Sequence, residues 1–267
     1  MNILNDRSLL SQLPYGEATK ATQPSAYRLG FWSAILTALS AAVALGIGVT
    51  TPPRSGPFCT LDLTDACVIY PYTDVAAYVP RDYIWMVPAL LMGLLFMLLV
   101  VCIHHAAAPQ QKVVSQMAVL FAAGAAITLT LDYFIQLTVM QPSLLKDEAE
   151  GLSLFSQYNP HGIFIALEDI GYLLMGVSFL FLVPVFDQRG GLGRSIRLLL
   201  LICGLLAVGS FLLLALLYGY DLEYRYEVAA IVIDWVALII GGTLLSLFFR
   251  RLIGSGAATH LGGKPGA

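Results

Sequence analysis

Hydrophobic residues in this chain occur in six long blocks that are separated by polar segments. The blocks cover residues 31–49, 84–103, 113–140, 162–186, 196–217 and 228–249. A helix needs about 20 predominantly apolar residues to cross a bilayer, and each block has roughly that length or more. The pattern therefore predicts an all-α fold: a polytopic integral membrane protein whose bundle of six transmembrane helices occupies residues 31–249.

The third block is the longest of the six. As a helix, residues 113–140 would extend roughly 42 Å, whereas the hydrocarbon core of a bilayer is ~30 Å thick. We therefore expect this span to tilt or to project beyond the membrane.

The polar segments complete the domain organisation. We expect residues 1–30 to form a cytoplasmic N-terminal tail, with a short interfacial helix near Leu9–Leu13. Residues 50–83 form the largest loop, on the outer face, and residues 250–267 form a glycine-rich cytoplasmic tail. The polar lead before the first block is too long for a secretory signal peptide.

The distribution of basic residues predicts the orientation, because cytoplasmic loops of membrane proteins are enriched in Lys and Arg. With both termini inside (N-in/C-in), ten basic residues lie on the cytoplasmic side and four lie outside. The ten are Arg7, Lys20, Arg28, Lys112, Arg189, Arg194, Arg197, Arg250, Arg251 and Lys264, and the four are Arg54, Arg81, Lys146 and Arg225. The expected location is a cell membrane, either a plasma membrane or a prokaryotic inner membrane.

Composition supports this class and excludes one kind of partner. The chain is 58% hydrophobic and 12% charged, whereas soluble domains are about 45–50% apolar and about 25% charged. The sequence contains no basic stripe of the kind that binds nucleic acid. The expected partners are the lipid bilayer and a small cationic or lipid ligand. No cofactor is expected, and the sequence leaves the oligomeric state open.

Two of the four cysteines lie in the largest loop. Cys59 and Cys67 fall in a segment that the predicted orientation places in an oxidising compartment, where disulfides persist. We predict that these two residues form a disulfide. Cys102 and Cys203 lie within spans and are expected to pack as small apolar side chains.

Four acidic residues lie inside the predicted spans, where an unpaired charge costs at least ~2.5 kcal/mol. They are Asp132, Glu168, Asp169 and Asp234. Each lies about 9–12 Å below the outer edge of its span, so three helices place four carboxyl groups in one layer. Because no basic residue lies in these three spans, the four acids cannot all be ionised side by side without a cation.

Other polar residues share helix faces with these acids. Gln136 follows Asp132 by four residues, and His161, Glu168 and Tyr172 also have helical spacing. The candidates for binding a ligand or a proton are therefore Glu168, Asp169, Asp132, Asp234, Gln136, His161 and Tyr172. Two alternatives stay open: hydrogen bonds that only hold the bundle together, and unrelated placement. No catalytic residue is assigned. No metal site is predicted, although carboxylates alone would suit a hard cation.

Two features of the outer loops are also informative. Asn159 and Pro160 precede the fourth block and predict a helix start, with Asn159 as the N-cap and Pro160 at the first helical position. Aromatic residues gather in the outer loops and at outer span ends, as in an interfacial belt that would also roof an outward pocket. They are Tyr70, Tyr72, Tyr78, Tyr83, Trp85, Tyr158, Tyr218, Tyr220, Tyr224 and Tyr226.

Three classes of function fit this pattern. The first is a protein whose outward-facing intramembrane acidic pocket binds or moves a proton, a cation or a cationic small molecule. The second is an intramembrane enzyme that acts on a lipid or isoprenoid by carboxylate acid–base chemistry. The third is a non-catalytic sensor or assembly subunit. A transporter usually has helices broken near the bilayer midplane, an enzyme a nucleophile or metal motif, and a sensor an output domain. None of these features is clear, so the choice stays open.

Overall fold

The computed structural model describes residues 15–60, 67–186 and 190–261, and every element of secondary structure in these ranges is a helix. Six stretches of the described chain are long and apolar enough to cross a membrane: Ser25–Gly48, Arg81–Ala106, Pro109–Leu145, Ile163–Val185, Gly191–Asp221 and Tyr224–Ser255. The all-α fold and the six membrane-length segments are thus confirmed, and the chain has the form of a multi-pass membrane protein.

Six long helices build the bundle. They are α2 (Tyr15–Gly48), α3 (Met86–Ala106), α4 (Lys112–Ile135), α6 (Ile163–Leu182), α7 (Gly191–Tyr218) and α8 (Tyr224–Leu261). One short α-helix, α5 (Gln141–Leu145), and one π-helical turn, η5 (Gln136–Met140), extend α4. Single 3₁₀ turns lie between the long helices: η1 (Gly56–Phe58), η2 (Ala76–Tyr78), η3 (Arg81–Tyr83), η4 (Pro109–Gln111), η6 (Leu152–Phe155), η7 (Val183–Val185) and η8 (Gly219–Asp221).

Two helices extend well beyond the apolar blocks that predicted them. Helix α2 begins at Tyr15 rather than at Phe31, and α8 continues to Leu261. Residues 15–30 and 250–261, expected as parts of polar tails, are therefore helical. Hydropathy marks the part of a helix that suits a bilayer, whereas Glu, Gln, Lys and Arg continue a helix readily in water. The interfacial helix expected near Leu9–Leu13 lies outside the described residues.

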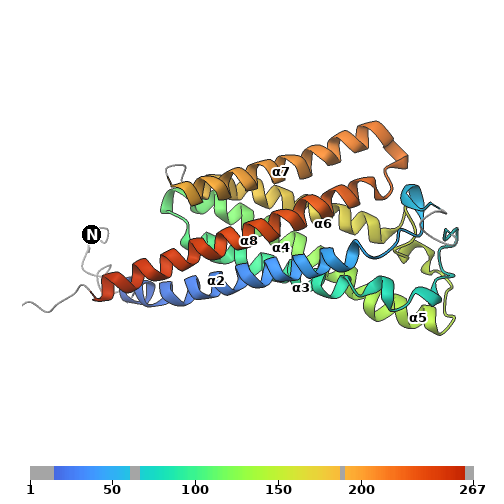
Figure 1. The fold of residues 1–267 in the computed structure, drawn as a ribbon, viewed down its shortest axis with the longest axis horizontal. Helices are drawn as coiled ribbons and strands as arrows, with labels where there is room; N and C mark the ends of the chain where they lie inside the picture. The colour runs from blue at the N-terminus through green and yellow to red at the C-terminus, as the bar shows by residue number, and fades with distance from the viewer. Residues whose placement is uncertain (1–14, 61–66, 187–189, 262–267) are drawn as a thin grey trace, which may run out of the picture.

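The six long helices form a closed antiparallel ring. Each packs against the next in chain order, and α8 packs against α2 to close the ring; α6 and α8 also touch across it. The described connections 49–60, 67–85, 141–162 and 219–223 all lie at one end of the bundle (Figure 1), which we call the disulfide end. Because the helices alternate in direction, the end of α4 lies at the same level as the starts of α6 and α8.

The third span is not one continuous α-helix. Pro142 sits in the first turn of α5; it has no N–H, and its ring would clash with the carbonyl of Thr138 four residues earlier. The turn before it, η5, widens to a π-helix and so avoids the clash. The full stretch Pro109–Leu145 is longer than a bilayer core, and its last turns project into the disulfide end.

Small residues allow the helices of the ring to approach closely, as is common between membrane helices. A Cβ atom at Gly242 of α8 would lie 2.6 Å from the carbonyl oxygen of Ala34 and 2.9 Å from the Cβ of Ala38, both on α2. A Cβ atom at Gly176 of α6 would lie 2.6 Å from that of Ala207 on α7. These contacts leave no room for a side chain at either glycine.

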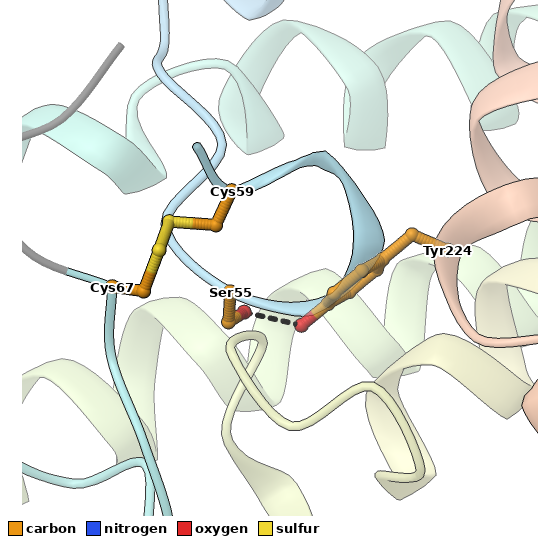
Figure 2. The surroundings of a disulfide bond; sticks show 4 residues. All are labelled: Ser55, Cys59, Cys67 and Tyr224. Carbon is orange, nitrogen blue, oxygen red and sulfur yellow. Dashed lines mark hydrogen bonds between the residues drawn. A yellow bond between two sulfur atoms is a disulfide. The ribbon is translucent and has the colours of Figure 1, made fainter. Parts of the chain in front are cut away.

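The predicted disulfide is confirmed. Cys59 and Cys67 are bonded, with their Cα atoms 6.0 Å apart. Figure 2 shows the bond beside Ser55, whose hydroxyl lies 2.8 Å from the hydroxyl of Tyr224 at the start of α8. The backbone N–H of Val68 also donates to the carbonyl of Arg54. We call residues 49–60, which follow α2, the strap. The disulfide fixes the strap at Cys59, and Ser55 ties it to the start of α8.

Gly242→Ala should destabilise the bundle, because the new methyl group meets a backbone oxygen that cannot rotate away. We expect a loss of about 1–3 kcal/mol, as for overpacking in a tight core. Gly209→Ala on α7 is the control: nothing lies within 4 Å of a Cβ there, and alanine favours a helix by up to about 1 kcal/mol. Thermal unfolding of both variants in dodecyl maltoside tests this, and equal unfolding temperatures would contradict the close α2–α8 contact.

Candidate functional site

A cavity of about 300 Å³ opens at the disulfide end, between the end of α2, the segment after it, and the starts of α3 and α8. Its walls are mostly apolar and aromatic. The lining residues include Leu45, Val49, Arg54, Phe58, Asp82, Trp85, Tyr158, Tyr224, Glu227, Val228, Ile231, Val232 and Trp235. The expected aromatic roof is thus present in part: three residues of the predicted belt, Trp85, Tyr158 and Tyr224, line this cavity.

An ion pair holds one wall of the cavity. The Nε of Arg54 pairs with Oδ2 of Asp82, which is almost fully buried, and the hydroxyl of Tyr158 donates to the same oxygen over 3.2 Å. The Arg54 guanidinium lies 3.5 Å above the ring of Tyr78. Arg81 adds a longer contact of 3.7 Å to Asp82. The one arginine that lines the cavity is therefore already neutralised.

The shifted pKa values of Arg54 and Tyr158 keep the Arg54–Asp82 ion pair intact. Burial alone would lower the pKa of Arg54, but the hydrogen bond and the charge of Asp82 raise it above its usual range. Burial raises the pKa of Tyr158, and the nearby Tyr83 and Asp82 add to the effect. Arg54 thus stays cationic and Tyr158 stays a neutral donor at any physiological pH.

Glu227 links the cavity to the interior of the bundle. It lines the cavity, is buried, and approaches Glu168 of α6 within hydrogen-bonding reach. A carboxylate accepts hydrogen bonds only, so a bond between two carboxyl groups requires that one of them carries a proton. Glu168 is completely buried, and its Oε1 accepts a hydrogen bond of 2.5 Å from the hydroxyl of Tyr133.

A chain of aromatic donors ends at Glu168. The indole Nε1 of Trp235 donates to the hydroxyl of Tyr172 over 3.0 Å, and the hydroxyls of Tyr172 and Tyr133 lie 2.6 Å apart. Since Tyr133 uses its proton for Glu168, Tyr172 must donate to Tyr133. Three donors therefore point in series toward one carboxyl, an arrangement in which each bond polarises the next. Trp235 also lines the cavity, so the chain begins and ends close to it.

Two more of the predicted acids join this group. Asp132 of α4 is buried and lies within electrostatic range of Glu168, and Asp169, which is half-buried, does too. Glu227 interacts with all three. We call Asp132, Glu168, Asp169 and Glu227 the acid cluster.

The acid cluster is incompletely satisfied. In the described chain, no hydrogen-bond partner reaches Asp132 Oδ2, Glu168 Oε2, Asp169 Oδ1 or Glu227 Oε2. The ion pairs formed by described Lys, Arg and His residues involve Asp82 and Glu223 and none of these four acids. Buried charges require a partner. A proton, a water or a cation has to supply what the protein does not.

Three predicted site residues lie apart from the acid cluster. Asp234 is completely buried near Tyr172, Tyr226 and Cys203, and neither of its oxygens has a partner in the described chain. Gln136 donates to the carbonyl of Phe155 over 2.6 Å and so ties the π-helical turn to η6. His161 is exposed and lies 4.0 Å from Glu223.

The position of His161 follows from where α6 begins. The helix starts at Ile163 with Gly162 as its N-cap, so the prediction of Asn159 as the N-cap and Pro160 as the first helical residue was wrong. Asn159 instead organises the turn before the helix, where its Oδ1 accepts a hydrogen bond from the backbone N–H of His161. The helical spacing that linked His161 to Glu168 does not apply, because His161 precedes the helix.

Several residues of the site were not among the sequence candidates. They are Tyr133, Glu227, Trp235, Arg54 and Asp82. Tyr133 and Trp235 directly follow the acids Asp132 and Asp234, and an adjacent helical residue points about 100° away, toward a different neighbour. Glu227 has helical spacing to Asp234, seven residues later, but lies one residue outside the predicted span. The Arg54–Asp82 pair left no signal, because it joins two loop positions 28 residues apart.

No family model, no curated protein and no solved structure matches this chain.

Tyr133→Phe should destabilise the protein by about 1–3 kcal/mol, because Glu168 loses a buried donor. Tyr226→Phe is the matched control: this tyrosine is equally buried, yet its hydroxyl has no partner in the described chain, so its loss should be neutral or slightly stabilising. Thermal unfolding in detergent measures both. If Tyr226→Phe cost as much as Tyr133→Phe, the hydroxyl chain would not be a stabilising network.

Proposed function

We propose that this multi-pass membrane protein binds a small organic cation in the cavity at its disulfide end, with Glu227 as the anionic partner. The observation that carries the proposal is an excess of buried acid. Behind Glu227 stand three further carboxyls, and the one arginine in the cavity wall is paired with Asp82. A cation at Glu227 would supply the charge that this part of the bundle lacks.

The aromatic walls favour an organic cation over a metal ion. Trp85, Trp235, Tyr158, Tyr224 and Phe58 all line the cavity, and aromatic faces attract ammonium groups, most strongly when these are desolvated. A hard metal ion needs six or more oxygen ligands. In the described chain, no three His, Cys, Asp or Glu side chains are arranged to hold one.

The acid cluster would couple the binding of a cation to the release of a proton. Where Glu227 and Glu168 share a proton, a cation that pairs with Glu227 competes with that proton. The displaced proton has two acceptors at hand, because Asp132 and Asp169 both lie beside Glu168. This favours exchange of a cation for a proton, because Glu168 is buried behind Glu227 and does not line the cavity.

We also propose the orientation N-in/C-in, with the disulfide end outside. The distribution of basic residues over the whole sequence, ten on the proposed cytoplasmic side and four outside, supports it. The disulfide supports it too, because disulfides are typical of oxidising compartments. The cavity then faces the outside of a cell membrane.

Choline binding tests the site. Trp85 and Trp235 line the cavity, so ligand binding should change their fluorescence; Trp32, which is 59% exposed, is removed by Trp32→Phe to lower the background. We expect saturable binding that Glu227→Gln weakens at least tenfold, or about 1.4 kcal/mol. Glu148→Gln, at an exposed loop position, should change nothing. The uncharged isostere 3,3-dimethyl-1-butanol should bind much more weakly; equal binding of both probes would refute a cation site.

Reporter fusions test the orientation. A fusion at Gly190 should report a cytoplasmic location, and fusions at Asp147 and Asp221 an external one. Cys59 and Cys67 in intact cells should react with a membrane-impermeant maleimide only after reduction, since their thiols are bonded. The opposite result at any one fusion site, or no labelling even after reduction, contradicts the proposed orientation. Labelling without a reductant would show instead that the two thiols are not bonded.

A further inference from the structure

One side of the cavity is aliphatic and open. It is formed by Leu45 and Val49 at the end of α2 and by Val228, Ile231 and Val232 on the first turns of α8. Val49 is 73% exposed, Val228 43% and Val232 49%. All but Val49 belong to stretches long and apolar enough to span a membrane, and Val49 directly follows one. Lipid, rather than water, is the neighbour that suits such an edge.

This aliphatic edge reaches deep along the bundle. Val232 lies eight residues after Tyr224, so the edge extends about 12 Å along α8 from the start of the helix. The apolar block that predicts this span begins at residue 228, directly after Glu227. Along α8, the acid therefore stands at the polar boundary and the valines stand at the depth of acyl chains. We call this aliphatic edge of the cavity, formed by Leu45, Val49, Val228 and Val232, the portal.

The opposite side of the cavity is tied down by polar contacts. Arg54 pairs with Asp82, the hydroxyl of Ser55 lies 2.8 Å from that of Tyr224, and the Tyr224 hydroxyl lies 3.1 Å from the carbonyl of Gln157. Figure 2 shows how the strap carrying Ser55 reaches Tyr224 next to the disulfide. These bonds hold the segment after α2 over the cavity, so access from the loops requires breaking them. Between α2 and α8 the cavity is lined by aliphatic side chains, which form no hydrogen bonds that entry would have to break.

We propose that the ligand is an amphiphile: a cationic headgroup with an alkyl chain, which enters from the bilayer through the portal. The headgroup pairs with Glu227 beside the contacting rings of Trp85 and Trp235, and the chain lies along Val228 and Val232. This inference rests on the proposed cation site and adds the class of ligand and its route. A cavity of about 300 Å³ holds a headgroup and the first part of a chain; the remainder of the chain lies in lipid.

The shape of the site accounts for both halves of such a molecule. Burying each methylene group along the portal contributes favourable free energy in water, but little in lipid, where the chain is already in an apolar solvent. The alkyl chain therefore concentrates the ligand in the membrane, and it must also fit along Val228 and Val232, where a bulky side chain would displace it. A tail-less cation has the same headgroup contacts but no chain to concentrate it in the membrane.

The test compares two probes in two variants. Tetramethylammonium and octyltrimethylammonium are titrated into the full chain in dodecyl maltoside, an uncharged detergent, at one fixed detergent concentration. Val232→Phe narrows the portal, and Val236→Phe is the matched control, since Val236 lies one turn further along α8, is 37% exposed and does not line the cavity. Thermal unfolding confirms that both variants fold.

We expect octyltrimethylammonium to bind the wild type and Val236→Phe at least tenfold more tightly than tetramethylammonium. In Val232→Phe that preference should fall by at least fivefold, because the phenyl ring takes the place of the chain. Equal affinity of both probes for the wild type overturns the inference and leaves the cation site standing. The same preference in Val232→Phe as in Val236→Phe also overturns it, because the gain then comes from partition into detergent. Binding of neither probe removes the cation site itself, and this inference with it.

Discussion

A cluster of carboxyl groups inside an apolar bundle, to which no described basic residue is paired, is the constraint on which this structure depends. Asp132, Glu168, Asp169 and Glu227 come from three helices, and what the bundle offers them is neutral: a single chain of donors that ends in the Tyr133 hydroxyl. Neutral donors stabilise a carboxylate but cannot cancel its charge. Compensation must come from protons or from a cation, both of which can leave. The proposed exchange of a cation for a proton rests on this property of the cluster.

Helix direction and close packing bring the acids together. The end of α4 meets the starts of α6 and α8 at the disulfide end because the ring alternates in direction. The contact of α6 with α8 across the ring then places Glu168 beside Glu227. Glycines set how near the helices come: Gly171 of α6 faces Leu129 of α4, where a Cβ atom would lie 2.6 Å from the leucine side chain. A bundle of larger residues would hold the same acids too far apart to share a proton.

Sequence reasoning predicted the all-α fold and placed three of the four acids of the cluster at one depth, for identifiable physical reasons. Six apolar blocks and helix periodicity place Asp132, Glu168 and Asp169 at one level, because depth follows directly from residue number. Periodicity failed for His161, since it assumed a helix that begins only at Ile163. Asp234 lies at the right depth yet faces away, because depth does not determine which neighbour a helix face meets. That information is tertiary.

The contacts made by loop residues were the part of the site that the sequence predicted least well. The Arg54–Asp82 pair depends on how the segment after α2 folds over the bundle, which no local pattern describes. The π-helical turn at Gln136–Met140 was in principle readable from Pro142, whose ring forbids a regular α-helix before it. The hydrogen bond that Gln136 of this turn donates to the carbonyl of Phe155 could not be predicted in the same way. Residues whose roles are set inside one helix were predictable, and residues whose roles are set between segments were not.

The way in which Arg54 is held explains why Glu227 keeps no basic partner in the cavity. Arg54 lines the same cavity as Glu227 and could neutralise it, which would turn the acid into half of a structural ion pair. The structure prevents this from three directions: Asp82 binds the guanidinium, the Tyr78 ring lies against its face, and the strap that carries Arg54 is fixed to Tyr224 through Ser55. Asp82 in turn is held by Tyr158. Anchoring a cation away from an unpaired acid costs electrostatic energy, and it leaves Glu227 free for a partner from outside the chain. The disulfide that closes the strap belongs to the same arrangement, because it restricts the segment on which Arg54 and Ser55 lie.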